Sequence, residues 1–390
     1  MYNIDRIQQY DIIVTKGVYK LSNAIYLDNA STTPLCEAAK QVMLENIDNY
    51  YNTANVYEPA RQMRCKVEAA RERIAELIGA ESANEIYFTS GGSEANSWAL
   101  HNKFSLVSNI EHSSVCGNMT FPVASNGIVN VAQFESALAS YVGVFCPHID
   151  VVSLMSANNE IGTIQPISDI AHIAHKHGVL FHSDMVQLLP HMKVNIKDIG
   201  VDMASASAHK FNGPKGVGFL YVKNGVNIDP MIYGGTQERN KRGGTTNALG
   251  VLAMAAALDD TLQHLDETNA KIIELQYKLE SCLLDIKGVA TNGSCAKTQR
   301  IQGISNFRID GVRGADVVAM ASQYGIYLSA GSACHEGDAL PSHVLTAIGL
   351  TDEQALSSIR ISVGRHNTEN DINRLCDVLH AIIRMLRNTR

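Results

Sequence analysis

The chain has 390 residues, of which 45% are hydrophobic and 18% charged, and its formal net charge is −7. This length predicts about two domains, and the mildly acidic balance argues against a general grip on nucleic acid. The longest clearly apolar run, residues 249–258, is far shorter than the roughly twenty residues of a membrane span. Because no apolar block of a secretory signal is visible near the start, we expect a soluble protein of a bacterium-like cytoplasm.

Strands and helices alternate along the first part of the chain, from residue 25 to residue 222. Predicted strands lie near residues 85–90, 150–155, 179–183, 202–207 and 217–222, and predicted helices near residues 59–79, 92–103 and 167–177. This alternation predicts an α/β fold with a mainly parallel sheet that helices cover on both faces.

A long periodic segment, residues 248–286, then predicts one or two helices that link two domains. Beyond it lie predicted strands near residues 303–309 and 358–363 and predicted helices near residues 314–323 and 369–387. These elements indicate a smaller α+β domain. We expect a large cofactor-binding domain at 25–262 and a small domain formed by 1–24 and 263–390.

A turn of small residues, 89–94, joins the first predicted strand to a helix that begins near Ser93. Backbone amides at such a helix start point at an anion, and the helix dipole and the Ser93 hydroxyl add to the attraction. We interpret Gly92 and Ser93 as a phosphate-binding turn. The alternative is an ordinary helix start.

The apolar strand at 179–184 ends in a carboxylate, Asp184. Open α/β sheets bind ligands at the carboxyl ends of parallel strands. Asp184 is therefore a candidate partner for the protonated ring nitrogen of a bound cofactor. Gln187, three residues further, is a candidate donor to a phenolic oxygen on the same ring. The alternative role for Asp184 is a helix N-cap.

Lys210 follows the next apolar strand and precedes a glycine-rich turn. Poor hydration disfavours an ammonium group, so such a lysine can lose its proton near neutral pH and attack a carbonyl. Pyridoxal phosphate (PLP) is the carbonyl compound that proteins most often use in this way. Ser207 and His209, beside the lysine, would complete a phosphate site. The alternative is a lysine that reaches out to solvent.

Two residues near the C-terminus complete the candidate site. Cys334 lies in a run of small residues, and a thiol on such a loop can act as a nucleophile in its thiolate form. Arg360 lies in an alternating strand, where its planar guanidinium can bind a carboxylate through two nitrogens. The alternatives are a loop cysteine without a chemical role and an interstrand salt bridge.

Together these motifs resemble the fold-type I, class V pyridoxal-phosphate enzymes, and specifically the cysteine desulfurases, from about residue 25 to the C-terminus. The matching motifs are residues 26–34, 89–94, 111–112, 158–162, 182–187, 207–210, 242–245, 332–334 and 358–365. The resemblance implies a large domain with a mainly parallel seven-stranded sheet and a smaller α+β C-terminal domain that carries the cysteine loop.

The resemblance also implies a role for each site residue. Lys210 binds PLP covalently, Asp184 pairs with its pyridine nitrogen, and His112 stacks on its ring and moves protons. Asn159 and Gln187 hold the ring oxygen; Gly92, Ser93, Ser207 and His209 hold the phosphate; Asn159 and Arg360 bind the substrate carboxylate; and Thr245 reaches the phosphate of the other subunit in a homodimer. No metal is expected, although Cys334 is the candidate for contact with an iron–sulfur cluster during transfer.

The implied reaction removes sulfur from L-cysteine, giving L-alanine and a persulfide on Cys334 for a sulfur-acceptor protein in iron–sulfur cluster assembly or thiolation. The loop between Cys334 and Pro341 has the length found in the family's first group. The alternatives are a selenocysteine lyase, a class V aminotransferase, and a scaffold without catalysis. An aminotransferase would not need Cys334, so persulfide formation discriminates between these functions.

The chain departs from the family pattern at residues 52–55 and Glu58, in a short connection from Ser93 to His112, and in the extension 1–24. These places lie near the expected entrance, so they bear on substrate access and acceptor docking rather than on the chemistry. Because the chain stops soon after its last predicted helix, we also expect no tail of the kind that some members use to meet a scaffold protein.

The remaining candidates for metal or redox chemistry are cysteines and histidines. The eight cysteines, at positions 36, 65, 116, 146, 282, 295, 334 and 376, contain no Cys-x-x-Cys pair. We therefore expect reduced thiols, mostly in the core. His172, His175 and His177 close an amphipathic helix without an acidic or thiol ligand set, and we expect them to face solvent.

Overall fold

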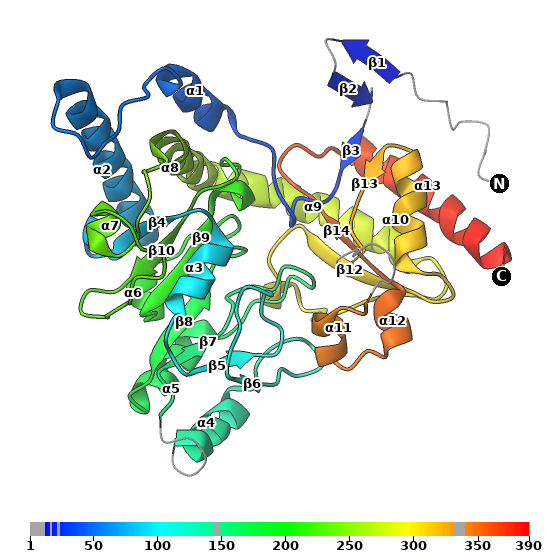
Figure 1. Ribbon diagram of the computed structural model, residues 1–390. Helices are drawn as coiled ribbons and strands as arrows, with labels where there is room; N and C mark the ends of the chain where they lie inside the picture. Colours follow the sequence, from blue (N-terminus) through cyan, green and yellow to red (C-terminus); the bar gives the residue numbers. More distant parts are fainter. Residues whose placement is uncertain (1–11, 16–17, 22–23, 143–147, 331–339, 390) are drawn as a thin grey trace. The chain divides into compact units, whose positions relative to one another are not determined.

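The computed structural model describes residues 12–15, 18–21, 24–142, 148–330 and 340–389 (Figure 1). It divides into two compact units. The small unit comprises the described residues of 1–31, 159–162 and 267–390, and the large unit comprises those of 32–158 and 163–266. The domain limits expected from the sequence stay a prediction.

The large unit is built on a seven-stranded sheet with the order β4-β10-β9-β8-β7-β5-β6. Its strands are β4 (Ile86–Thr89), β5 (Ser105–Ser108), β6 (Met119–Phe121), β7 (Val151–Ser153), β8 (Leu180–Asp184), β9 (Met203–Ser207) and β10 (Gly218–Val222). Strand β10 is antiparallel to both of its neighbours, and the other pairings are parallel. The expected α/β fold with a mainly parallel seven-stranded sheet is therefore confirmed.

Helices cover this sheet, and its central strands are almost entirely buried. The helices of the large unit are α1 (Glu37–Asn46), α2 (Glu58–Ile78), α3 (Gly92–Ala99), α4 (Val131–Ser140), α5 (Ile167–Lys176), α6 (Ile196–Ile199), α7 (Gln237–Asn240) and α8 (Ala248–Gln263). Helix α3 packs on β9 and β10, and α5 packs on β8. Strand β9 has the sequence Met-Ala-Ser-Ala-Ser, and its small Ala and Ser side chains let α3 approach closely.

The small unit has a three-stranded antiparallel sheet of β11 (Val289–Thr291), β12 (Ile304–Ile309) and β14 (Ser358–Ser362). Strand β3 (Ile25–Tyr26) pairs in parallel with β13 (Ile326–Tyr327), and β1 (Ile12–Thr15) pairs with β2 (Val18–Leu21). The helices are α9 (Leu265–Leu284), most of which belongs to this unit, α10 (Gly314–Gln323), α11 (His343–Ala347), α12 (Asp352–Leu356) and α13 (Glu369–Asn388). One apolar core joins side chains of α9, α10 and α13 with those of the three-stranded sheet and of the β3–β13 pair.

The long periodic segment expected at 248–286 forms two helices, α8 and α9, that are separated at His264. The elements that sequence reasoning did not predict include β5, β6, β11 and β13 and the helices α1, α4, α11 and α12. Most of them are short, so they offer too few residues for a hydrophobic period to show. No helix in the described ranges is both long enough and apolar enough to cross a membrane.

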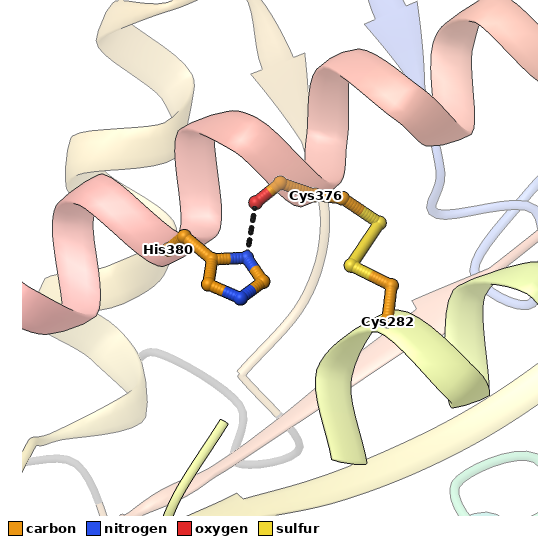
Figure 2. The surroundings of a disulfide bond; sticks show 3 residues. All are labelled: Cys282, Cys376 and His380. Carbon is orange, nitrogen blue, oxygen red and sulfur yellow. Dashed lines mark hydrogen bonds between the residues drawn. A yellow bond between two sulfur atoms is a disulfide. The ribbon is translucent and has the colours of Figure 1, made fainter. Parts of the chain in front are cut away.

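The cysteines differ from the expectation of reduced, mostly buried thiols. Cys282 of α9 and Cys376 of α13 form a disulfide (Figure 2), because the two helices pack in one core and bring the Cα atoms to 6.3 Å. One turn further along α13, His380 Nδ1 is hydrogen-bonded to the Cys376 carbonyl oxygen at 2.9 Å. Of the other described cysteines only Cys36 is buried, while those at 65, 116 and 295 are exposed. The expectation of reduced thiols is therefore wrong for Cys282 and Cys376 and confirmed for the other four described cysteines, and the expected burial is wrong for the three exposed ones.

The three histidines near the end of α5 differ in exposure, and one of them contacts a carboxylate. His172 and His175 are exposed and His177 is half-buried. His175 Nε2 lies 2.7 Å from a carboxylate oxygen of the buried Asp202. The solvent-facing placement is therefore confirmed for His172 and His175.

Candidate active site

Lys210 lies just beyond the carboxyl end of β9, as the sequence predicted, in a single 3-10 turn formed by Ala208–Lys210. The turn is fixed from a distant part of the chain. Thr33 donates both its backbone N–H and its hydroxyl to the His209 carbonyl oxygen, each at 2.9 Å. The Thr33 hydroxyl also accepts from the Asn212 backbone N–H at 2.9 Å. Hydrogen bonds at His209, before the half-buried lysine, and at Asn212, after it, therefore fix the backbone around Lys210.

Asp184 ends β8, the strand beside β9, and only 5% of its surface is exposed. Its carboxylate accepts hydrogen bonds from Asn96 Nδ2 at 2.6 Å and from the Val186 backbone N–H at 2.9 Å. Burial raises the pKa of this carboxyl, and the hydrogen bonds from the Val186 backbone N–H and from Asn96 oppose the rise. No helix begins at Asp184, so the N-cap role is wrong.

The exposed His112 follows β5, and its ring is hydrogen-bonded within a short turn. Its Nδ1 lies 2.7 Å from Ser114 Oγ and 3.2 Å from the Ser114 backbone nitrogen. Ser114 Oγ in turn accepts from Asn96 Nδ2 at 3.0 Å. The structure thus links His112 to Asp184 through Ser114 and Asn96. Sequence reasoning missed both linking residues, although Asn96 lies four residues after Gly92, one helical turn from the predicted phosphate site.

Glu111, beside His112, joins the carboxyl ends of two strands. Its Oε1 accepts from the Ser108 hydroxyl of β5 at 2.6 Å and from the backbone N–H of Met155, just after β7, at 2.7 Å. The side chain is buried, and burial raises its pKa to about 8. Asn158 Nδ2 adds a bond to the Ile110 carbonyl oxygen at 3.1 Å. The turn that carries His112 is therefore anchored at its start.

The predicted phosphate turn lies between β4 and α3, which begins at Gly92. A Cβ on Gly92 would lie 2.9 Å from Val186 Cγ2 and 3.4 Å from Ser207 Cβ, so only glycine allows this close approach. Ser207 is buried at the end of β9, and Ser93 is exposed in the first turn of α3. Gly92 and Ser207, two of the predicted phosphate ligands, are thus brought together.

His209 and Gln187 occupy the same two strand ends. His209 Nδ1 is 3.1 Å from Thr32 Oγ1. Burial, helped by the charges of Lys210 and Lys215, lowers the His209 pKa to about 4, so the ring is uncharged at neutral pH. Gln187 is buried in the turns that follow Asp184.

Thr245 is exposed at the end of a segment that strong contacts hold against the sheet. Glu238, Arg239 and Asn240 all have positive φ values, of 44°, 56° and 63°. Such strain persists only where the surroundings enforce it. Here the Glu238 carboxylate is bound by both terminal nitrogens of Arg71, at 2.7 and 2.9 Å, and by the Phe88 backbone N–H at 2.9 Å.

Arg242 adds a second ion pair at the same place, to Glu94 of α3 at 2.8 and 3.0 Å. Glu94 also accepts from the Ser90 backbone N–H at 2.7 Å. A hollow of about 160 Å³ lies beside these groups, lined by residues that include Thr89, Ser90, Arg242 and Thr245. Ion pairs therefore tie the Thr245 segment to the phosphate turn.

Arg360 lies on β14 of the small unit and is 6% exposed. One terminal nitrogen donates to Asp28 Oδ1 at 2.8 Å and to Ser31 Oγ at 2.6 Å, and the other donates to the Asn159 carbonyl oxygen at 2.9 Å. Its Nε is buried and has no hydrogen-bond partner among the described residues. The ion pair that sequence reasoning kept as an alternative is present, but it leaves part of the guanidinium uncommitted. The half-buried Asn159 lies beside Arg360.

Cys334 falls in residues 331–339, outside the described residues, but the chain on either side of that segment is described. Ser329 exchanges two backbone hydrogen bonds with Arg360, at 3.1 and 2.7 Å. On the other side, the Ser342 hydroxyl donates to Glu160 Oε2 at 2.6 Å, and burial raises the pKa of Glu160. Sequence reasoning missed Glu160, although it lies in the matching motif at 158–162.

Comparisons with known proteins agree with this arrangement. The class V aminotransferase family model matches residues 25–375. The chain is 36% identical, over 388 residues and 94% of each chain, to a cysteine desulfurase IscS of Methanosarcina thermophila. Its fold is similar to a NifS-like protein of Rickettsia africae, with a TM-score of 0.83, 30% identity and coverage of 92% of this chain and 99% of that one. It is also similar to SspA in complex with cysteine, with a TM-score of 0.74, 28% identity and coverage of 88% and 100%. The chain therefore belongs to the class V aminotransferase family, within the branch of the cysteine desulfurases.

Proposed function

We propose that the protein is a PLP-dependent cysteine desulfurase that converts L-cysteine to L-alanine and holds the sulfur as a persulfide on Cys334. The observation that carries the proposal is the pair formed by Asp184 and Lys210 at the carboxyl ends of the adjacent parallel strands β8 and β9. The names of the relatives, cysteine desulfurases, support the activity, and the solved structure of SspA in complex with cysteine supports the substrate.

The predicted cofactor ligands fit PLP chemically. Asp184 is a buried carboxylate whose ionised form needs a positive partner, and a protonated pyridine nitrogen supplies one. Gly92 leaves the space beside Ser207 that a Cβ would fill, next to backbone amides at the start of α3 that favour a phosphate. Gln187 and Asn159 would hold the ring oxygen, Ser93 and His209 would join the phosphate ligands, and Lys210 would bind the carbonyl carbon.

When bound, PLP supplies a ring that withdraws electrons from the carbon next to the substrate's amino group. Asp184 keeps the proton on the ring nitrogen. Lys210 takes the proton from that carbon and later returns protons to the substrate. Arg360, with its uncommitted Nε, binds the substrate carboxylate. His112 acts at the substrate sulfur.

The sulfur transfer itself is assigned to Cys334. Its thiolate attacks the substrate sulfur, so that a sulfur–sulfur bond forms and the carbon–sulfur bond breaks. The electron pair of the broken bond stays with the carbon fragment, which gains a proton and leaves as alanine. Persulfide sulfur then passes to an acceptor protein for iron–sulfur cluster assembly or thiolation, in the cytoplasm.

Mass spectrometry tests this function directly. Purified holoenzyme is incubated with L-cysteine without a reductant, and the Cys334 peptide should gain one sulfur atom while alanine accumulates. Cys334→Ser should retain PLP and lose sulfide release, whereas Lys210→Ala should lose the yellow absorption as well. Sulfur on a different cysteine, or undiminished desulfuration by Cys334→Ser, would contradict the proposal. Amino-group transfer to a keto acid would indicate an aminotransferase, and a marked preference for selenocysteine would indicate a lyase for that substrate.

We also propose a homodimer in which Thr245 reaches the cofactor phosphate of the other subunit. The proposal is supported by the motif at 242–245 and by the ion pairs of Arg242 and Glu238, which hold an exposed threonine in a fixed place. Isologous contacts of this kind occur in pairs. Light scattering at decreasing protein concentration, with activity measured on the same samples, tests it. A fully active monomer would contradict it.

A further inference from the structure

We infer that Ser114 is a positioning residue that fixes His112 as the tautomer with its proton on Nε2 and, through Asn96, ties the ring to Asp184. The inference rests on the proposed function, because His112 and Asp184 matter only as groups that act on the substrate and the cofactor. It concerns Ser114 and Asn96, to which the motif analysis gave no role. Every step uses hydrogen bonds within the large unit.

The backbone N–H of Ser114 decides the state of Nδ1. A backbone N–H can donate but cannot accept, and the one at Ser114 lies 3.2 Å from His112 Nδ1 with hydrogen-bonding geometry. Nδ1 must therefore offer its lone pair. In a neutral imidazole one nitrogen accepts and the other carries the proton, so the proton lies on Nε2.

The orientation of Asn96 is fixed by the carboxylate that it meets. An ionised carboxylate oxygen can only accept, so the atom 2.6 Å from Asp184 Oδ2 is the amide nitrogen. The second hydrogen of that nitrogen points to Ser114 Oγ at 3.0 Å. Asn96 is 1% exposed, and its Oδ1 has no partner among the described residues. The side chain thus keeps both donor bonds although its own oxygen is left unsatisfied.

The direction of the hydrogen bond between Ser114 Oγ and His112 Nδ1 follows from the two hydrogen bonds that Asn96 donates. Because Ser114 Oγ already accepts from Asn96, its own O–H is available to donate to His112 Nδ1 at 2.7 Å. Two donors, the hydroxyl and the backbone N–H, therefore converge on Nδ1. Hydrogen bonds of this kind hold both the orientation and the tautomer of an imidazole.

The consequence concerns what His112 does at the substrate. A neutral ring with its proton on Nε2 donates a hydrogen bond from the edge opposite Ser114. It stabilises a negatively charged sulfur, and it cannot take a thiol proton at Nε2 without breaking its bonds to Ser114. The thiol proton of L-cysteine must therefore pass to a group other than His112 Nε2.

The tautomer can be read by ¹⁵N NMR of protein labelled at its histidines, with the His112 signals assigned by their absence in His112→Gln. In the wild type, without cysteine, Nε2 should carry the proton and Nδ1 should not. A proton on Nδ1 of the neutral ring would overturn the inference. This readout needs no turnover, so it stands or falls separately from the desulfurase activity.

Kinetics of three variants complete the test. Ser114→Ala should lower kcat by about tenfold, the order expected for one hydrogen bond, with KM for cysteine and PLP content unchanged and a larger share of the Nδ1-protonated tautomer. Ser114→Thr keeps the hydroxyl and should restore both readouts. Ser113→Ala, at the exposed neighbouring serine, is the matched control and should behave as wild type. Equal kcat and equal spectra for Ser114→Ala and wild type would refute the role of Ser114.

Discussion

Two buried arginines, Arg71 in the large unit and Arg360 in the small unit, are used in opposite ways. Arg71 binds both oxygens of Glu238, reaches the Ile86 carbonyl oxygen at 2.8 Å, and lies 4.1 Å above the centre of the Phe88 ring. Arg360 binds one oxygen of Asp28 and leaves its Nε without a partner among the described residues. Burial alone does not separate them, since 4% of Arg71 and 6% of Arg360 is exposed.

The two arginines differ in how completely their donors are met rather than in burial. A donor without a partner does not by itself indicate ligand binding, because the buried Nε atoms of Arg239 and Arg300 also have no hydrogen-bond partner among the described residues. An arginine whose donors are all met by its own chain stabilises that chain and has nothing left for a ligand. A buried arginine with a donor that lacks an acceptor destabilises the protein without ligand, and a substrate carboxylate that accepts from this donor removes the cost. The comparison therefore predicts that one arginine controls folding and the other controls substrate binding.

The largest effect is expected from Arg71→Met. Removing the guanidinium leaves the buried Glu238 carboxylate without its cation, which destabilises proteins by about 3–5 kcal/mol. Urea unfolding should therefore show a much lower free energy of unfolding, together with weaker PLP retention if the Thr245 segment loosens. Arg73→Met is the control on the same helix, because Arg73 pairs at the surface with Glu76 and Asp259 and should cost only about 1 kcal/mol or less. Equal losses in the two variants would contradict the distinction.

The second effect is expected from Arg360→Lys. An ammonium keeps the charge but not the planar set of donors, so kcat/KM for L-cysteine should fall by about 100-fold, mainly through KM, while thermal stability changes little. Arg300→Lys is the matched control in the small unit, because Arg300 is similarly buried, also has an Nε without a partner among the described residues, and is bound to Glu280. That variant should change stability and leave KM as it is. A normal KM in Arg360→Lys would place substrate binding elsewhere.

The smallest effect extends the comparison from arginines to carboxylates. The Glu238 carboxylate is bound by a guanidinium, whereas Glu111 Oε1 accepts from a hydroxyl and a backbone N–H. Burial raises the pKa of Glu111 to about 8, so the folded protein binds this proton more tightly than the unfolded chain does. The stabilisation is present at low pH and is lost as the pH rises toward about 8.

The measurement is the free energy of unfolding between about pH 6 and about pH 8, where the wild type should lose up to about 2 kcal/mol from this group. Glu111→Gln carries a neutral amide and should lose less across the same range. If the free energy of unfolding changed with pH in the same way in the two proteins, the pKa of Glu111 would not be raised.

Sequence reasoning succeeded where a long apolar strand ends in a polar residue. Strands β8 and β9 have that form, so the places of Asp184 and Lys210 could be predicted before any contact was known. The Asn96–Asp184 bond could not, because it joins residues 88 positions apart and depends on how α3 packs against the strand ends. The chemical roles of the site residues stay predictions, and Cys334 lies outside the described residues.

Residues 238–240 show a second limit of prediction from the sequence. Positive φ at a glycine can be anticipated from sequence, but Glu238, Arg239 and Asn240 carry no such signal. The segment is held by the bond between Glu238 and Arg71, two residues that lie 167 positions apart in the chain. Tertiary contacts override local preference there. A single sequence does not reveal this.

The disulfide between Cys282 and Cys376 closes a covalent ring of chain that contains both Cys334 and Arg360. Any thiol reagent added to discharge sulfide from a persulfide is also a reagent for this bond, since both reactions are attack of a thiolate on a sulfur–sulfur bond. Because L-cysteine is itself a thiol, this disulfide meets a thiol in persulfide assays too, and it meets a more strongly reducing mixture in sulfide assays with an added reductant. Rates from the two assays are comparable only after the state of the Cys282–Cys376 pair has been measured in each.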